Sequence, residues 1–476
     1  MSQANPPGKP LDGIRVLDVS TMLAGPYGAT LLGDLGADVV KVESHLGDDS
    51  RRLGAMRDGE CGPFLSLNRS KRDVVIDMQL PQGQQVFARL AATADVLITN
   101  VREPALSKLG LNYEQVKAHR PDVVWIGVTA FGPDGPYAGR PGIDFLTQGY
   151  CGVLGLNGEP GGGPVRTGFP AVDVITSLLV SNAALAALRV RDRTGQGQRI
   201  EVSLLDALMH AQASSIGSYL ATGEPPRRTG NRSQYFAPSG VYPTQDGRHV
   251  IITTPSEKFF GNVCRALGAD WDTDPRFHDI GSRLANHDEL DRVMSERTRQ
   301  FDREELVQRL IAADVLCAPI NDVADVVKDP QIRHNQMIVR LEHPSLGPLD
   351  VTGVPIRFYG TPCRVERHPP MHGEHTRELL AGLGYARRWQ RFSRWSQDRE
   401  GHVTASVERR NSGEPMLRAG FGGEWNFSWG GPFIEGIVTI SAAGSGPSTI
   451  RFPGAVLLNI GYRYSFAKAA APAEEE

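Results

Sequence analysis

Asp173 is a candidate for chemistry because it opens an apolar helical stretch that runs to Leu188. A carboxylate at a helix N-terminus lies among unpaired backbone N–H groups and at the positive end of the helix dipole. We therefore expect it to stay ionised at neutral pH without a basic partner. Gly168 and Pro170 precede it and could leave its approach open. Position alone allows two roles: an N-cap, which is a common place for aspartate, or a nucleophile.

The residues after Asp173 predict the elements that must position it. Apolar side chains recur at helical spacing, namely at Ile175, Leu178, Leu179, Leu185 and Leu188. A polar turn at 191–197 then ends the predicted helix. Residues 199–203 follow as a predicted strand, and a second helix is predicted to begin at Leu204.

The first half of the chain alternates predicted strands and helices. One helix is predicted to start at Pro26, because proline suits the first helical turn, and another covers 84–94. The predicted strands are residues 14–20, 38–43, 73–78, 95–99 and 122–129. This alternation is typical of a parallel sheet that helices cover on both faces, so we predict an α/β fold.

The pattern changes from about residue 225. A loop-like stretch at 222–231 reads as a linker, and a strand at 249–254 follows. Helices are predicted at 257–267, 287–301 and 303–313, and Asp302 and Glu305 stand at capping-box spacing. Strands at 338–342, 349–352 and 356–359 are predicted to return the chain to the first domain. The resulting division is a large domain at 1–224, a smaller α/β domain at 225–330, a return segment at 331–386 and an appended tail at 387–476.

The tail does not share the pattern of the preceding residues. It holds four of the six tryptophans, and apolar or aromatic residues occupy every even position from 456 to 466. That alternation predicts a strand, and it resembles the closing strand of an outer-membrane barrel. We interpret the tail as an appended segment of foreign origin, β-like or disordered. An exported barrel fragment is the alternative.

The composition argues against several classes of protein. A net charge of −3 leaves no basic footprint for nucleic acid. The five cysteines are scattered without metal-ligand or redox spacing, which favours a reducing compartment. The first nine residues lack the apolar core of a secretory signal, and we expect no apolar run long enough to span a membrane. These features together predict a cytoplasmic protein with no nucleic-acid or membrane partner.

Several segments, in this order along the chain, resemble the class III coenzyme A transferases, the family of formyl-CoA and carnitine CoA-transferases. The resemblance extends over roughly 8–386, and the segments that carry it are 10–18, 24–26, 32–43, 68–73, 94–100, 173–198 and 373–376. It implies a doubly wound, Rossmann-like sheet domain with a smaller α/β domain, and an intertwined homodimer. It also implies that Asp173 is the nucleophile that accepts the acyl group. Coenzyme A or acyl-CoA would then be a co-substrate, with no tightly bound cofactor and no metal.

The resemblance also implies where coenzyme A binds. By position, the family's contacts fall at Leu23, Ala24, Ser44, Ile76, Asp77, Met78, Gln79, Asn100, Val101, Arg102 and Lys108, with Arg140 and Asp144 as further candidates. Leu23 and Ser44 depart from formyl-CoA transferase, which has glutamine and arginine there, so formate or oxalate is disfavoured as the transferred acid. Lys108 keeps a positive charge. Solvated surface charge is the simpler interpretation of Arg102 and Lys108.

Two other functions remain open at this point. The α-methylacyl-CoA racemases share the fold and the aspartate, but they carry a second acid–base histidine where this chain has Ile143. A CoA-binding protein without catalysis is the other alternative. Asp144 could contact CoA or cap its own helix. The glycine-rich stretch 155–163 could supply backbone N–H groups to an oxyanion or be a surface loop. The sequence has no zinc-hydrolase, serine-hydrolase or phosphate-loop motif.

Overall fold

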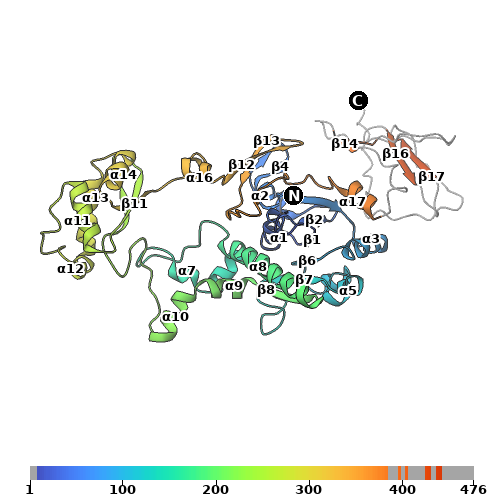
Figure 1. Ribbon diagram of the computed structural model, residues 1–476, viewed down its shortest axis with the longest axis horizontal. Helices are drawn as coiled ribbons and strands as arrows, with labels where there is room; N and C mark the ends of the chain where they lie inside the picture. The colour runs from blue at the N-terminus through green and yellow to red at the C-terminus, as the bar shows by residue number, and fades with distance from the viewer. Residues whose placement is uncertain (1–7, 384–394, 398–402, 406–423, 430–435, 442–476) are drawn as a thin grey trace, which may run out of the picture. The chain divides into compact units, whose positions relative to one another are not determined.

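The computed structural model describes residues 8–383, 395–397, 403–405, 424–429 and 436–441. The chain divides into two compact units, Met1–Thr376 and Arg377–Glu476. The first unit contains the predicted parallel sheet (Figure 1). Its six strands run in the order β5-β2-β1-β6-β7-β8. Their bounds are β1 (Arg15–Val19), β2 (Asp38–Glu43), β5 (Lys71–Val75), β6 (Val96–Thr99), β7 (Val124–Thr129) and β8 (Gln198–Ser203).

All neighbouring strands of this sheet are parallel. In the central strand, Val16 pairs with Val39 of β2 on one side and with Val96 of β6 on the other. The α/β prediction and the parallel sheet are therefore confirmed. Because the strands are parallel, the loops that follow β1, β2, β5, β6 and β7 all emerge at one edge of the sheet.

Helices cover both faces of the sheet. Alternate strand residues such as Val16, Ile98 and Ile126 pack with α1 (Ala24–Asp34) and α8 (Ala171–Thr194) in one buried core. The neighbouring residue Trp125 points to the other face, where its indole N–H donates to Leu111 O. Also in this unit are α2 (Gly62–Leu67), α3 (Pro81–Ala91), α4 (Ala105–Lys108), α5 (Tyr113–His119), α6 (Asp144–Tyr150), α7 (Val153–Leu156), α9 (Leu204–Ala211), α10 (Ala213–Thr222), the 3-10 helix η1 (Asp49–Arg51) and the hairpin of β3 (Met56–Arg57) and β4 (Glu60–Cys61).

Helix α8 corrects one expectation from the sequence. It has 24 residues with a mean hydropathy of 1.8 in its most apolar window, so its length and composition would suffice to cross a membrane. In the fold it lies beside α1 and buries Val180 and Ala184 in the core under the sheet, as an apolar core helix does (Figure 1). The apolar run thus has a place in a packed core, and the cytoplasmic location stays a prediction.

Residues 239–319 form a three-stranded sheet with its own core. Its strands are antiparallel in the order β11-β10-β9, and Val250 and Ile252 of the central strand pack against Phe260 and Leu306. The elements are β9 (Ser239–Pro243), β10 (His249–Thr253), β11 (Leu316–Pro319), α11 (Glu257–Leu267), α12 (Ile280–Ala285), α13 (His287–Thr298) and α14 (Arg303–Ala312). Asp302 precedes α14, but its side chain makes no cap hydrogen bond, so the capping box predicted with Glu305 is wrong.

The return segment contacts the large sheet near β5. Two short helices, α15 (Val323–Val326) and α16 (Pro330–His334), lead into it, and it contains a hairpin of β12 (Ile338–His343) and β13 (Gly347–Thr352). Residues 356–359, predicted as a strand, are described by the structure and do not form one. Leu349 and Val351 pack against Leu65. The backbone N–H of Gly373 donates to an oxygen of Asp73, and the N–H of Val75 donates to Thr376 Oγ1 at 3.1 Å. The motif at 373–376 therefore fastens this segment to a sheet strand.

The second unit begins within α17 (Thr376–Gly382). Its other described elements are two antiparallel hairpins, β14 (Trp395–Gln397) with β15 (Val403–Ala405), and β16 (Glu424–Trp429) with β17 (Gly436–Ser441). The strand predicted at 455–466 lies outside the described residues. The four-part domain division remains a prediction.

Candidate active site

A cavity of about 460 Å³ opens at the edge where the strands of the large sheet end. Its lining comes from five places: residues 21–24 after β1, Asn100 and Arg102 after β6, the end of β7 with the start of α6, residues 166–170 with Asp173 at the start of α8, and Leu204 at the start of α9. Asp173 is the nucleophile candidate from the sequence, and it lies in this lining. The cavity thus brings together loops that are far apart in the chain.

Asp173 is the third residue of its helix rather than the N-cap. Helix α8 begins at Ala171, Pro170 stands at the cap position, and no side chain of this segment caps the helix. The N-cap role that the sequence left open for Asp173 is therefore wrong. The carboxylate of Asp173 does not cap the helix, so it remains available to react with a substrate in the cavity.

Asp144 caps α8 from a different helix. Its Oδ2 accepts the backbone N–H groups of Val172 at 2.8 Å and Asp173 at 3.2 Å. Asp144 is itself the first residue of α6, so it does not cap its own helix as one interpretation of the sequence had it. Its Oδ1 accepts a hydrogen bond from Gln148 Nε2 at 2.6 Å, and Gln148 also bonds Thr167 in the loop before α8. This set of contacts fixes the start of the Asp173 helix.

The ionisation of Asp173 differs from the expectation. Burial, and then the nearby negative charge of Asp144, raise the pKa of Asp173 to about 7. The sequence predicted a carboxylate that is fully ionised at neutral pH because of the helix dipole. In the structure the N–H groups of Val172 and Asp173 donate to Asp144 instead, so they do not stabilise the charged form of Asp173.

Ser177 joins the Asp173 helix to α1. Its hydroxyl lies 2.9 Å from the carbonyl oxygen of Ala24 and 2.8 Å from that of Asp173, within hydrogen-bond distance of both. Because Ala24 is the first residue of α1 and also lines the cavity, the position of α1 is coupled to that of the nucleophile candidate.

The predicted CoA contacts fall into two groups. Those that line the cavity with Asp173 are Leu23, Ala24, Asn100, Arg102 and Asp144. Those outside its lining are Ser44, Ile76, Asp77, Met78, Gln79, Val101, Lys108 and Arg140. Most of the second group follow β2, β5 and β6 at the same sheet edge, but Ile76 is buried at 5% exposure and Arg140 stacks on Tyr137 at 4.3 Å. Their binding of CoA remains a prediction.

The cavity lining contains two arginines and no histidine. Arg102 and Arg166 contribute positive charge, and the guanidinium of Arg166 lies 5.5 Å from the ring centre of Phe145. Ile143, which stands where the racemases have their histidine, is 62% exposed. Among the described residues, no group of His, Cys, Asp and Glu side chains is arranged to hold a metal ion.

Sequence reasoning missed Gln148, Thr167 and Arg166. Gln148 is almost fully buried, and its spacing of four residues from Asp144 on one helix was the signal that could have identified it. The glycine-rich stretch 155–163 does not line the Asp173 cavity; Gly158 instead accepts a hydrogen bond from the N–H of Gly230. That stretch therefore lacks the position that an oxyanion role requires.

Comparisons with known proteins agree on one family. The model of CoA-transferase family III matches residues 11–376. The chain is 35% identical over 386 residues to a succinate–glutarate CoA-transferase of Agrobacterium fabrum, which covers 79% of this chain and 96% of the relative. It is 31% identical over 375 residues to a human succinyl-CoA:glutarate CoA-transferase, covering 78% and 85% of the two chains.

A solved structure supports the same assignment. The crystal structure of a CAIB/BAIF family protein from Brucella suis aligns with a TM-score of 0.75 and 36% identity. The alignment covers 79% of this chain and all of the other. The match in sequence and the match in fold thus cover the same share of the chain.

Proposed function

Because this chain belongs to CoA-transferase family III, we propose that it exchanges coenzyme A between an acyl-CoA and a free acid through a covalent intermediate on Asp173. That the chain is a CoA-transferase follows from the family and its relatives. The covalent route and the residues that carry it are the proposal. The observation that supports it most is the placement of Asp173 in a cavity, held by α8 but not engaged in capping it.

The proposed reaction begins when the Asp173 carboxylate attacks the thioester carbonyl carbon. The C–S bond breaks, the CoA thiolate leaves, and a mixed anhydride remains on Asp173. The thiolate then attacks the aspartyl carbonyl, which releases the donor acid and leaves an aspartyl-CoA thioester. The acceptor carboxylate attacks this thioester, expels the thiolate and forms a second anhydride. Attack of the thiolate on the acceptor's carbonyl produces the new acyl-CoA and restores the Asp173 carboxylate.

The charge state of Asp173 suits both halves of this cycle. A pKa of about 7 leaves much of the group ionised at neutral pH, and a more basic carboxylate is a stronger nucleophile. Asp144 supports the reaction by holding the backbone of Val172 and Asp173 while its own charge keeps the neighbouring carboxylate reactive. Substrates that displace water from the cavity would protect the anhydride from hydrolysis.

We infer that the exchanged acids are dicarboxylic. The two relatives named above act on succinate or succinyl-CoA and on glutarate. In this chain, Arg102 and Arg166 lie in the same cavity as Asp173, and arginine pairs well with a carboxylate. One carboxylate of the acceptor would react while an arginine binds the other. Acceptors should therefore rank by kcat/KM with succinate and glutarate above butyrate, and equal values would reject this substrate class.

A homodimer is part of the proposal as well. Large apolar side chains are exposed on the helices next to the cavity, including Phe145 and Tyr150 on α6 and Leu178 on α8. A second copy of the chain would bury such side chains. Light scattering of the full chain measures its oligomeric state. A monomer at micromolar concentration would reject the homodimer.

The transfer assay tests the covalent route. Asp173→Ala and Asp173→Asn should reduce transfer of CoA from succinyl-CoA to labelled glutarate by at least about a thousandfold, because no oxygen nucleophile remains. CoA should still bind to both variants. Incorporation of solvent deuterium at the α-carbon of the acyl-CoA, without formation of a new thioester, would instead indicate racemisation. Retained transfer in either variant would reject Asp173 as the acyl acceptor.

A further inference from the structure

The loop between β1 and α1 lines the Asp173 cavity through Thr21, Met22, Leu23 and Ala24. We propose that Asp48, which lies outside the cavity lining, is the positioning residue that sets this loop for the incoming thioester. The inference rests on the proposed function, because it assigns to Asp48 an effect on the acyl-CoA half of that reaction.

Side chains bond each backbone polar group from Ser20 N to Met22 N, and apart from Asp18 they come from other parts of the chain. The N–H of Ser20 donates to Asp18 Oδ1 at 3.1 Å, and its carbonyl accepts from Lys41 Nζ at 3.0 Å. The side chain of Asn100 bonds both backbone groups of Thr21. Its Oδ1 accepts from the N–H of Thr21 at 3.0 Å, and its Nδ2 donates to the carbonyl oxygen of Thr21 at 2.8 Å. The N–H of Met22 donates to Asp48 Oδ1 at 3.1 Å. The loop is thus shaped by side chains rather than by a backbone ladder.

Met22 is the strained point of this loop. Its φ is +71°, in the left-handed region that residues other than glycine rarely adopt. Such a conformation persists only where the surroundings determine it. The hydrogen bond from Met22 N–H to Asp48 acts at the strained residue itself, which makes Asp48 the contact that holds the backbone there.

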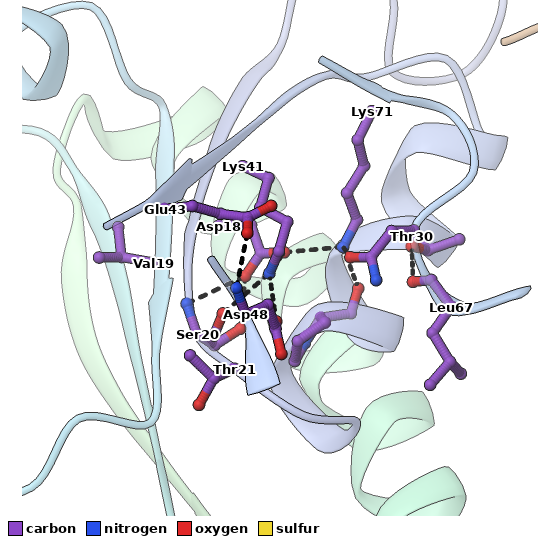
Figure 2. Close-up of polar contacts among 12 residues, drawn as sticks. Asp18, Val19, Ser20, Thr21, Thr30, Lys41, Glu43, Asp48, Leu67 and Lys71 are labelled. Carbon is purple, nitrogen blue, oxygen red and sulfur yellow. Dashed lines mark hydrogen bonds and ion pairs between the residues drawn. The ribbon is translucent and has the colours of Figure 1, made fainter. Parts of the chain in front are cut away.

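Asp48 is in turn held by a buried group of charges (Figure 2). Its Oδ2 makes an ion contact with Lys41 Nζ at 2.7 Å, and the side chains of both residues are fully buried. Lys41 lies 3.7 Å from Asp18, which is also paired with Lys71 at 2.7 Å. Burial alone would lower the pKa of Lys41, but Asp18 and Asp48 outweigh that effect and raise it. The ammonium group is therefore a fixed charge that keeps Asp48 oriented.

The same group reaches the start of α1. Lys71 Nζ donates to Pro26 O at 2.7 Å, and Ser177 lies within hydrogen-bond distance of both Ala24 O and Asp173 O. A displacement of the loop would therefore change the distance between the cavity wall and the nucleophile. Misplacements of about 1 Å lower enzyme rates by up to about a hundredfold. Asp48 is 1% exposed, so it would influence a substrate through the loop, directly at the N–H of Met22 and by way of Lys41 at the carbonyl of Ser20.

The experiment compares four variants with the wild-type protein. In Asp48→Asn an amide faces Lys41 and the charge contact is lost, so kcat/KM for succinyl-CoA should fall by about tenfold or more. Met22→Gly frees the strained backbone, while Met22→Ala removes the same side chain but keeps the Cβ. Met22→Gly should raise KM for succinyl-CoA at least about threefold above that of Met22→Ala, without a lower Tm. Gln336→Gly is the matched control. Gln336 also has a positive φ, +57°, but it lies outside the cavity lining, so this substitution should leave KM for succinyl-CoA unchanged.

The outcomes separate this inference from the proposed function. Wild-type kinetics in Asp48→Asn, or equal KM values in Met22→Gly and Met22→Ala, would overturn the role of Asp48 while leaving the covalent route intact. If Asp48→Asn does not fold, the comparison of KM between Met22→Gly and Met22→Ala tests the role of Asp48 by itself. If the wild-type protein transfers CoA without an acyl adduct on Asp173, the proposed function fails instead.

Discussion

At the scale of single residues, the charge state of Asp173 depends on its burial and on the nearby carboxylate of Asp144. The position of Asp173 before an apolar helix, together with the family resemblance, made it the candidate nucleophile, and that role stays a prediction. The raised pKa was not predictable, because it depends on burial and on Asp144, which is 29 residues away in the chain. The contact of Asp48 with Met22 was likewise not predictable, because the two residues lie on different loops.

The pair of carboxylates predicts a specific pH dependence. Because the folded-state pKa of Asp173 is about 7, transfer should rise as pH increases from 6 to 8 and the nucleophile loses its proton. Asp144→Asn removes the repelling charge, so the pKa of Asp173 falls and the midpoint of the profile moves to lower pH by roughly 0.5–1 unit. The rate at pH 8 should also fall, because α8 loses part of its cap. The pH dependence of single-turnover rates measures both effects.

The control for this prediction is Asp192→Asn, an exposed aspartate near the other end of the same helix. It should leave the midpoint unchanged. A midpoint that moves to higher pH in Asp144→Asn would show that Asp144 does not destabilise the charged form of Asp173.

At the scale of elements, most strands of the sheet were predictable within a few residues. The strand at 38–43 has the predicted bounds, whereas β5 begins at Lys71 rather than residue 73. Charged residues were the reason for that error, since Lys71 looks like a surface residue but is buried and paired with Asp18. The pairing of α1 with α8 was not predictable, because small residues at a helix contact carry no periodic signal.

Gly28 shows how close these two helices are. A Cβ at this position would lie 2.7 Å from Val180 Cγ1 and 3.2 Å from the carbonyl oxygen of Ser177. Gly28→Ala should therefore lower the free energy of unfolding by about 1–3 kcal/mol, measured by urea denaturation. Val180→Ala in the same chain should recover part of the loss, because the nearest atom is removed.

Gly217 in α10 is the matched control. A Cβ there meets nothing within 4 Å, so Gly217→Ala should be neutral or stabilise the protein by up to about 1 kcal/mol. Equal stability of Gly28→Ala and Gly217→Ala would mean that the α1–α8 contact is looser than described.

At the scale of the whole molecule, the family model accounts for the chain only up to about its last fifth. The family model ends at residue 376, and the Agrobacterium fabrum relative is 96% covered by 79% of this chain. The change in composition after residue 386 predicts a segment outside the family pattern. Its structure could not be predicted from alternation alone, and the strand predicted at 455–466 remains untested.

A shortened chain tests whether the tail contributes to function. A protein that ends at residue 386 should keep the kcat and KM of the full chain within about twofold, because its relatives are catalytic without this segment. The main thermal transition should shift by no more than about 2 °C. Loss of transfer with a preserved transition would instead assign the tail a part in the active assembly.

Chemical trapping during turnover shows whether Asp173 carries the acyl group. Wild-type protein is mixed with succinyl-CoA, quenched with hydroxylamine or borohydride during turnover, and its peptides are analysed by mass spectrometry. We expect a modified side chain at Asp173 that forms only when the thioester is present and is absent from Asp173→Asn. An unmodified Asp173 during continued transfer, or modification at another residue, would contradict it.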